Sequence, residues 1–86
     1  MTTTWRALLA EAMVKQGEVD ETYICTLTAA ELDEQFDNGF GGTQGKPFTA
    51  WTEKSVYFPI QYDGAEWVGS VSRHPDGNPT EHQGGG

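Results

Sequence analysis

Residues 47–73 decide the fold; they read PFTAWTEKSVYFPIQYDGAEWVGSVSR. Asp63-Gly64 is a strong signal for a two-residue hairpin, because a type I′ turn needs positive φ at both central residues. With that turn, the two strands pair in antiparallel register. The pairs are Tyr62 with Ala65, Ile60 with Trp67, Phe58 with Gly69 and Val56 with Val71. An earlier turn at Glu53-Lys54 adds a third strand with Trp51 opposite Val56, which makes the stretch a meander.

The register divides the side chains of the meander into two faces, since successive strand residues point to opposite sides. One face carries no charge, and we expect it to face the core; it comprises Trp51, Val56, Phe58, Ile60, Tyr62, Ala65, Trp67 and Val71. The other face is also apolar, with Phe48, Ala50, Tyr57, Pro59 and Val68. This second set could form an exposed partner patch or be covered by the glycine-rich loop or a helix. Two predicted helices favour cover.

Pro59 has to be reconciled with a central strand, because proline cannot donate a hydrogen bond to a β-ladder. In this register Pro59–Val68 is a non-hydrogen-bonded pair, so the missing N–H points toward the first strand. We therefore predict that pairing between the first and second strands stops just before Pro59. Gly69 leaves room opposite Phe58 that the ring can cover.

Two helices are predicted before the meander. The first covers Trp5–Gln16, with Thr3-Thr4 as its cap, apolar residues at helical spacing and Gly17 just past its end. The second begins at Ala29 behind a Thr28/Glu31 capping box, turns Leu32 and Phe36 inward, and ends at Asn38-Gly39.

The segment between the helices, Thr22–Leu27, is predicted to be a fourth short strand or an extended connection. Its alternating residues are Tyr23, Cys25 and Leu27, and Cys25 is expected to be a small core residue. A single cysteine excludes an intrachain disulfide. The predicted fold class is thus α+β: an antiparallel three- to four-stranded meander sheet packed with two helices. We expect one domain over residues 1–73 and a flexible polar tail over residues 74–86.

The net charge of the 86-residue chain is −8, from 13 acids and 5 bases. This balance argues against direct binding of nucleic acid, which needs a basic footprint, and against anionic membranes. No apolar run approaches the roughly 18 residues of a membrane span, and the N-terminus lacks the basic and apolar pattern of a signal peptide. The charge favours a basic protein partner.

Seven acids and no Lys or Arg lie between Gly17 and Gly45: Glu18, Asp20, Glu21, Glu31, Asp33, Glu34 and Asp37. Such a cluster can imitate a run of phosphates for a protein with a basic groove, and the binding would weaken with salt. It could equally be a solvated helix face and loop. We predict a partner-binding site from these acids, with Phe40 and Tyr57 as aromatic anchors.

Catalytic and metal sites are not predicted, so we expect no enzyme activity, no cofactor and no metal. His74 and His82 lie in the flexible tail, which cannot hold a base in fixed geometry within hydrogen-bond reach of a nucleophile. The glycine-rich loop, Asp37–Lys46, fails the phosphate-loop pattern because Phe40 and Pro47 stand where that pattern needs Gly and Ser or Thr. We expect its glycines to supply positive φ and let Phe40 tuck back.

Residues Asp37–Arg73 contain four short sequence motifs in succession, FDNGFGG, GKPFTAWT, VYFP and YDGAEWVGS, and Arg73 follows them. This set resembles small proteins encoded by bacteriophages and prophages. The resemblance implies a fold family and a role in inhibiting host defences, for which anti-CRISPR proteins are the best-known class. The implied partner is a host protein or ribonucleoprotein with a basic surface, such as a CRISPR effector, in the bacterial cytoplasm. The chain itself would be a monomer or weak dimer.

Two other functions stay open on the sequence. The chain could be a phage structural or assembly module that self-associates through an edge strand or the apolar outer face of the meander. It could also be a small-ligand binder that uses the glycine-rich loop.

Overall fold

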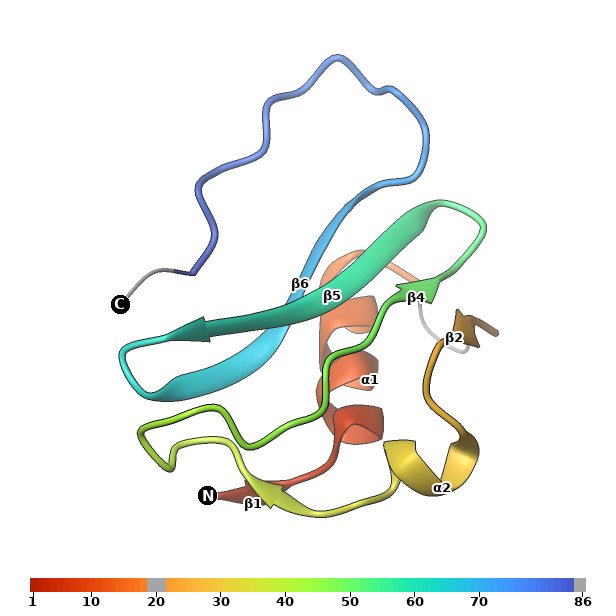
Figure 1. Ribbon diagram of the computed structural model, residues 1–86. Helices are drawn as coiled ribbons and strands as arrows, with labels where there is room; N and C mark the ends of the chain where they lie inside the picture. The colour runs from red at the N-terminus through yellow and green to blue at the C-terminus, as the bar shows by residue number, and fades with distance from the viewer. Residues whose placement is uncertain (19–21, 85–86) are drawn as a thin grey trace.

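The computed structural model describes residues 1–18 and 22–84 (Figure 1). Its main sheet is antiparallel with the strand order β2 (Ile24–Cys25), β4 (Ala50–Trp51), β5 (Ser55–Tyr62) and β6 (Ala65–Ser72). A second, two-stranded sheet joins β1 (Thr2–Thr3) to β3 (Phe36–Asp37). The helices are α1 (Trp5–Lys15) and α2 (Ala29–Leu32). The predicted α+β class is confirmed.

The predicted register of the meander is confirmed pair by pair. β5 and β6 place Tyr62 opposite Ala65, and every pair back to Ser55 with Ser72 follows in register. Asp63 and Gly64 both have positive φ, at 51° and 80°, as a type I′ turn requires. β4 pairs with Tyr57 and Val56 only, so the ladder stops before Pro59 as predicted.

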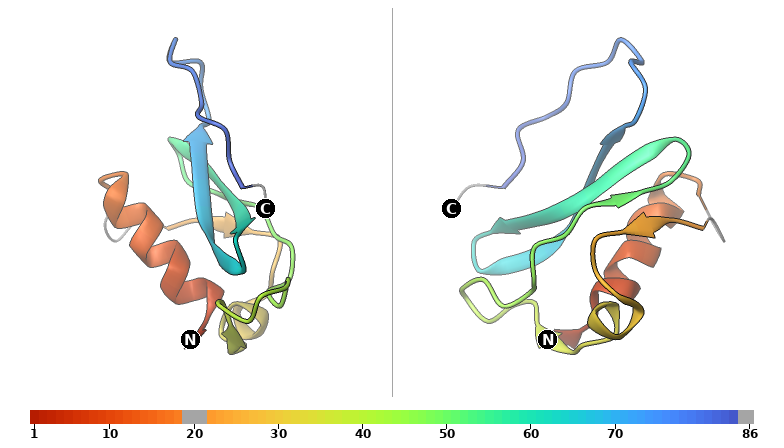
Figure 2. Two further views of the ribbon diagram at one scale, coloured as in Figure 1. Left: turned by 90° about the vertical axis from the view of Figure 1, so that its left-hand side faces the viewer. Right: turned by 45° about the vertical axis from the view of Figure 1, so that its right-hand side comes forward.

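The prediction of which sheet face meets the core is wrong. α1 lies on one side of the β5–β6 hairpin and packs against β6 (Figure 2). This is the face that carries Ala50 and Tyr57, and both of these side chains are completely buried. The core cluster comprises Trp5, Leu8, Leu9, Ala12, Met13, Leu32, Phe48, Ala50 and Tyr57. The two predicted helices therefore do cover the second apolar face, but the charge-free face is left on the outside of the domain.

One charged residue, Glu66, explains the misassignment, because it lies on the α1 side of the sheet and is only 4% exposed. Its carboxylate accepts hydrogen bonds from the backbone N–H groups of Gln44, at 2.9 Å, and Gly45, at 3.0 Å. A buried charge is tolerated when hydrogen bonds replace the water that it loses. The absence of charge was therefore a poor guide to the buried face.

The first helix forms as predicted. The Thr4 hydroxyl accepts a hydrogen bond from the N–H of Ala7 at 3.1 Å, and Gly17 follows the helix with a φ of 74°. Trp5, at the first helical position, lies between the rings of Phe36 and Phe48, whose centroids are each 4.8 Å away. Its buried indole anchors the N-terminal end of α1 in the core.

The second helix is shorter than predicted. The capping box between Thr28 and Glu31 is present, but the helix ends at Leu32 and Phe36 lies in β3. Phe36 and Asp37 instead pair with β1, and the N–H of Asn38 donates to the Met1 carbonyl at 2.9 Å. This small sheet was not predicted, because two-residue strands leave no periodic pattern to detect.

The fourth strand is confirmed as β2, which pairs with β4 and is shorter than Thr22–Leu27. Tyr23, Cys25 and Leu27 are partly buried and pack against the core, as their alternation predicted.

Candidate functional site: the open face of the sheet

The side of the main sheet opposite α1 is an uncharged surface rich in large apolar side chains. We name it the open face; it comprises Ile24, Trp51, Val56, Phe58, Ile60, Tyr62, Ala65, Trp67 and Val71. Tyr62 is 50% exposed and Trp67 is 38% exposed, and Ile24 is also exposed. Exposed apolar patches of this kind mark contact surfaces for other molecules.

The pairing of the strands places these side chains in rows across the sheet. Residues directly opposite one another in paired strands share a face, so one row crosses all four strands. It runs through Ile24, Trp51, Val56 and Val71. The rows nearer the hairpin turn pair Ile60 with Trp67 and Tyr62 with Ala65. The open face is therefore built on backbone pairing rather than on loops.

Glycine is required at the centre of this face. A Cβ at Gly69 would lie 2.3 Å from Ile60 Cδ1 and 2.9 Å from a ring atom of Phe58. Both side chains thus lie across Gly69, as predicted for Phe58. This close packing fixes the positions of the Phe58 and Ile60 side chains over Gly69.

The glycine-rich loop brings a further exposed aromatic residue, Phe40, to the turn of the hairpin. Gly41 donates its N–H to the carbonyl of Gly64 at 3.2 Å, and Phe40 beside it is 66% exposed. The expectation that Phe40 tucks back against the domain is wrong, because the loop packs on Trp5 through Gly45 instead. A Cβ at Gly45 would lie only 2.5 Å from a ring atom of Trp5.

Glu66 holds this loop in place from both ends. Its carboxylate binds the N–H groups of Gln44 and Gly45, and its own N–H donates to the carbonyl of Asn38 at 2.7 Å. The loop N–H groups nearest Lys46 are thus occupied by an internal carboxylate. This arrangement leaves them unsuited to a phosphate, which would need the same donors.

Two predicted site residues, Glu18 and Tyr57, are not on the surface. Glu18 is 6% exposed, Tyr57 is completely buried, and the Tyr57 hydroxyl donates to Glu18 Oε1 at 2.5 Å. This structure therefore presents neither side chain on the surface that a partner would contact. The hydroxyl of Tyr57 needs a buried acceptor, and Glu18, just after α1, supplies it.

The pKa of the Glu18 carboxyl group is lower than its usual value even though the side chain is buried. Burial alone would raise its pKa, but nearby hydroxyls, those of Thr52, Tyr57 and Ser55, stabilise the charged form, and Lys54 adds a favourable charge. The net effect is a lowered pKa. Within the described residues, Oε2 forms no hydrogen bond of good geometry.

The other described acids of the predicted cluster are exposed or half-buried, but each has a cationic partner. Asp33 binds Arg6 at 2.6 Å, Glu31 and Glu34 bind Lys46 at 3.2 and 3.1 Å, and Asp37 binds the N-terminal amine at 2.7 Å.

These contacts lower two of the carboxyl pKa values. The Glu31 pKa is lowered mainly by the N–H of Thr28, with help from Lys46. The Asp37 pKa is lowered mainly by the N-terminal amine and then by the N–H of Gly39. Four carboxylates thus face three cations, so this region is less negative than the sequence implied. Asp20 and Glu21 lie outside the described residues.

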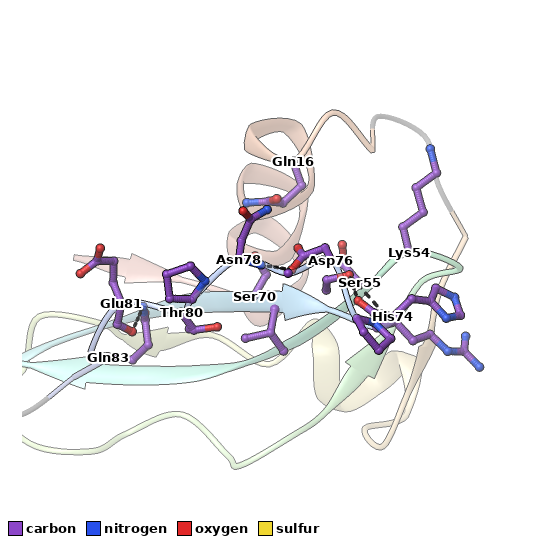
Figure 3. Close-up of a pocket in the computed structure, with 16 residues that line it drawn as sticks. Gln16, Lys54, Ser55, Ser70, His74, Asp76, Asn78, Thr80, Glu81 and Gln83 are labelled. Atoms are coloured by element: carbon purple, nitrogen blue, oxygen red, sulfur yellow. Dashed lines mark hydrogen bonds between the residues drawn. The ribbon is translucent and has the colours of Figure 1, made fainter.

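A polar hollow of about 850 Å³ lies between β6 and the segment that follows it (Figure 3). Its wall combines strand residues such as Ser55 and Ser70 with Asp76, Asn78 and Thr80 of the C-terminal segment. Lys54 and His74 lie at its end next to the β4–β5 turn (Figure 3). The hollow is wide and polar, unlike the apolar cleft that usually holds a small ligand.

In the described part of the chain, no three His, Cys, Asp or Glu side chains are placed to hold one metal ion. Over the same residues, neither helix is long and apolar enough to cross a membrane. Comparisons with protein-family models, curated proteins and solved structures find no significant match. The open face is therefore interpreted from its own geometry.

Proposed function

We propose that this chain is a non-enzymatic binding protein that acts by covering part of a larger protein complex. The observation that carries the proposal is the open face, where exposed aromatic side chains stand on a rigid sheet without a charge among them. Tyr and Trp are the side chains most often found at the energetic centre of protein interfaces. An uncharged centre also avoids the cost of removing water from ions.

The resemblance to phage proteins supports a specific version of this proposal. In that version the chain inhibits a host defence system in the bacterial cytoplasm, and its target is a nucleic-acid-handling complex such as a CRISPR effector. The net charge of −8 would speed its approach to a basic target surface. The open face would then supply most of the affinity, in place of the acidic cluster that the sequence favoured.

Charge separates this proposal from nucleic-acid binding. Exposed aromatic residues on a sheet can stack nucleobases, but such sites also need a basic groove for the phosphates. The open face carries no cation, and the chain is strongly acidic. A protein surface is therefore the better partner.

Alanine variants of the two aromatic residues test the proposal. Trp67→Ala and Tyr62→Ala should each weaken capture of the target from host lysate by about 30-fold, the effect of a 2 kcal/mol hot spot. Val14→Ala is the matched control, because Val14 is an exposed apolar residue on α1, away from the open face. It should leave capture unchanged.

A second pair of variants tests the acidic cluster on the same target. Asp33→Asn and Glu34→Gln remove exposed carboxylates that already pair with Arg6 and Lys46. We expect each to lower capture by less than about threefold, as is usual for charges at the rim of an interface. If these variants abolish capture while Trp67→Ala does not, the acidic cluster is the contact surface and the present proposal is wrong.

Self-association is the second candidate, and the same surface favours it. Two chains of charge −8 can approach most closely where neither carries charge, which is the open face. Sedimentation over a range of concentrations decides the matter. A dimer that Trp67→Ala dissociates would support an assembly role, whereas a monomer at high concentration would exclude it.

A further inference from the structure

The C-terminal segment, residues 74–84, returns from the end of β6 to the sheet, and we name it the strap. It begins with a tight turn in which the Ser72 hydroxyl accepts from the N–H of His74 at 3.3 Å and donates to the His74 carbonyl at 2.6 Å. The end of the strap and α1 lie on opposite sides of the β5–β6 hairpin (Figure 2). The strap therefore finishes on the side of the open face.

Gly84 is the point at which the strap meets the sheet. A Cβ at this position would lie 3.1 Å from the carbonyl oxygen of Gln61 and 3.9 Å from Ile60 Cγ2. Gly84 also has a φ of 74°, in the left-handed region that favours glycine. Both its conformation and its close approach to β5 thus call for a residue without a side chain.

The burial of Ile60 is the second sign of this contact. Ile60 belongs to the open face, yet it is only 5% exposed, whereas its cross-strand partner Trp67 is 38% exposed. Ile60 is not a member of the core cluster that α1 covers. Ile60 Cδ1 lies against Gly69 within the sheet, and Ile60 Cγ2 lies near Gly84 of the strap. Thr43, Gly45 and Pro47 of the preceding loop line a hollow beside Ile60 as well.

The strap is held only lightly. In the part of the chain that the structure describes, its hydrogen bonds beyond the first turn stay within the strap, from Asn78 to Asp76 at 3.0 Å and from Gln83 to Glu81 at 2.9 Å. The polar hollow separates its arch from β6. Its residues are polar apart from its prolines and glycines, so docking gains little from burial of apolar surface.

We propose that the strap is a displaceable cover on the open face: Gly84 docks on β5 in the free chain, and a partner must displace it to bind there. The docked contact of Gly84 with β5, which we call the seat, exists in the free chain. Competition between the strap and a partner rests on the function proposed above. The strap would thus tune the affinity of the open face without contributing a contact to the complex.

Isoleucine methyl NMR on the full chain tests the seat without any partner. The chain has two isoleucines, so Ile60 reports on the seat and Ile24, at the far edge of the sheet, is an internal control. Gly84→Ala should shift the Ile60 γ2 methyl signal and leave Ile24 in place.

Gly77→Ala is the matched variant, because Gly77 has a φ of 76° but no atom within 4 Å of an added Cβ. It should move Ile60 less than half as far as Gly84→Ala does. An unmoved Ile60 signal in Gly84→Ala, or an equal shift in Gly77→Ala, would overturn the seat.

Competition is tested by the affinity for a captured target. Gly84→Ala should strengthen binding about two- to fivefold. An alanine in the left-handed conformation costs about 1 kcal/mol, so it weakens docking of the strap on β5 by about fivefold at most. If Trp67→Ala weakens binding but Gly84→Ala leaves it unchanged, the cover is refuted while the proposed function stands. If neither variant changes binding, the open face is not the contact surface and the cover has nothing to regulate.

Discussion

Replacing Glu66 by glutamine should destabilise the domain far more than a typical glutamate-to-glutamine change. Glutamine keeps the shape of the side chain but turns one acceptor oxygen into an NH₂ donor. That group would face the backbone N–H of Gln44 or Gly45, now 2.9 and 3.0 Å from a carboxylate oxygen. One charged hydrogen bond would be lost, and one buried N–H would be left without an acceptor.

The expected cost follows from these contacts. A hydrogen bond to a charged group contributes about 1.5–3 kcal/mol, so Glu66→Gln should lower the free energy of unfolding by roughly 2–3 kcal/mol. For a domain of this size, that corresponds to a drop in Tm of roughly 8–24 °C. Urea denaturation and thermal unfolding followed by circular dichroism measure both quantities.

Glu53→Gln is the control, because Glu53 is exposed in the β4–β5 turn. It should change the unfolding free energy by no more than about 0.5 kcal/mol. If Glu66→Gln is as stable as Glu53→Gln, the loop is not held by this carboxylate, and the explanation given for the buried face of the sheet fails with it.

Three further predictions concern packing and pH. Gly45→Ala should cost about 1–3 kcal/mol because its Cβ would overlap the buried Trp5 indole, whereas Gly42→Ala, with open space around it, should be near neutral in the same denaturation assay. The pKa of Glu18 is lowered in the folded state. The contribution of Glu18 to stability is therefore present above its pKa in the unfolded chain and should be lost as the pH falls through its pKa in the folded protein. Urea denaturation at a series of acidic pH values would show this loss. Tyr57→Phe removes a hydroxyl that donates to Glu18 and should cost about 1–2 kcal/mol at neutral pH, less in strong acid; an equal cost at both pH values would contradict a role for the charged hydrogen bond.

Local chemistry in the sequence predicted much of the fold. Asp63-Gly64 fixed the hairpin turn, and from it the register of eight residue pairs followed correctly. Thr28 and Glu31 gave the start of α2 for the same reason, since a capping box depends on neighbours in the chain. Such signals are reliable when the interaction they describe spans only a few residues.

The choice between the two sheet faces depended on contacts that are distant in sequence. Both faces are apolar, and the charge on Glu66 argued against the face that is in fact buried. The N–H groups that make its burial possible belong to Gln44 and Gly45, more than twenty residues away in the sequence. Small residues do not separate the faces either, since Ala50 and Ser70 lie on the core face and Ala65 and Gly69 on the open face.

The acidic cluster carries less unpaired charge than the sequence suggested, for a related reason. The sequence placed seven acids together without a cation, but Arg6 and Lys46 reach the cluster from outside that interval, as does the N-terminal amine. Counting charges along the chain cannot reveal ion pairs that form across the fold. The aromatic residues of the open face were identified correctly as a set and assigned to the wrong environment.

Photo-crosslinking in bacterial lysate tests the proposed contact surface most directly, because it does not require the proposed target to be identified first. A benzophenone amino acid replaces Tyr62 on the open face, Val14 on α1 or Glu34 in the acidic cluster, each in a separate full-length protein. We predict one discrete adduct from position 62 that is absent from positions 14 and 34. An adduct from position 34 with none from position 62 would contradict the account.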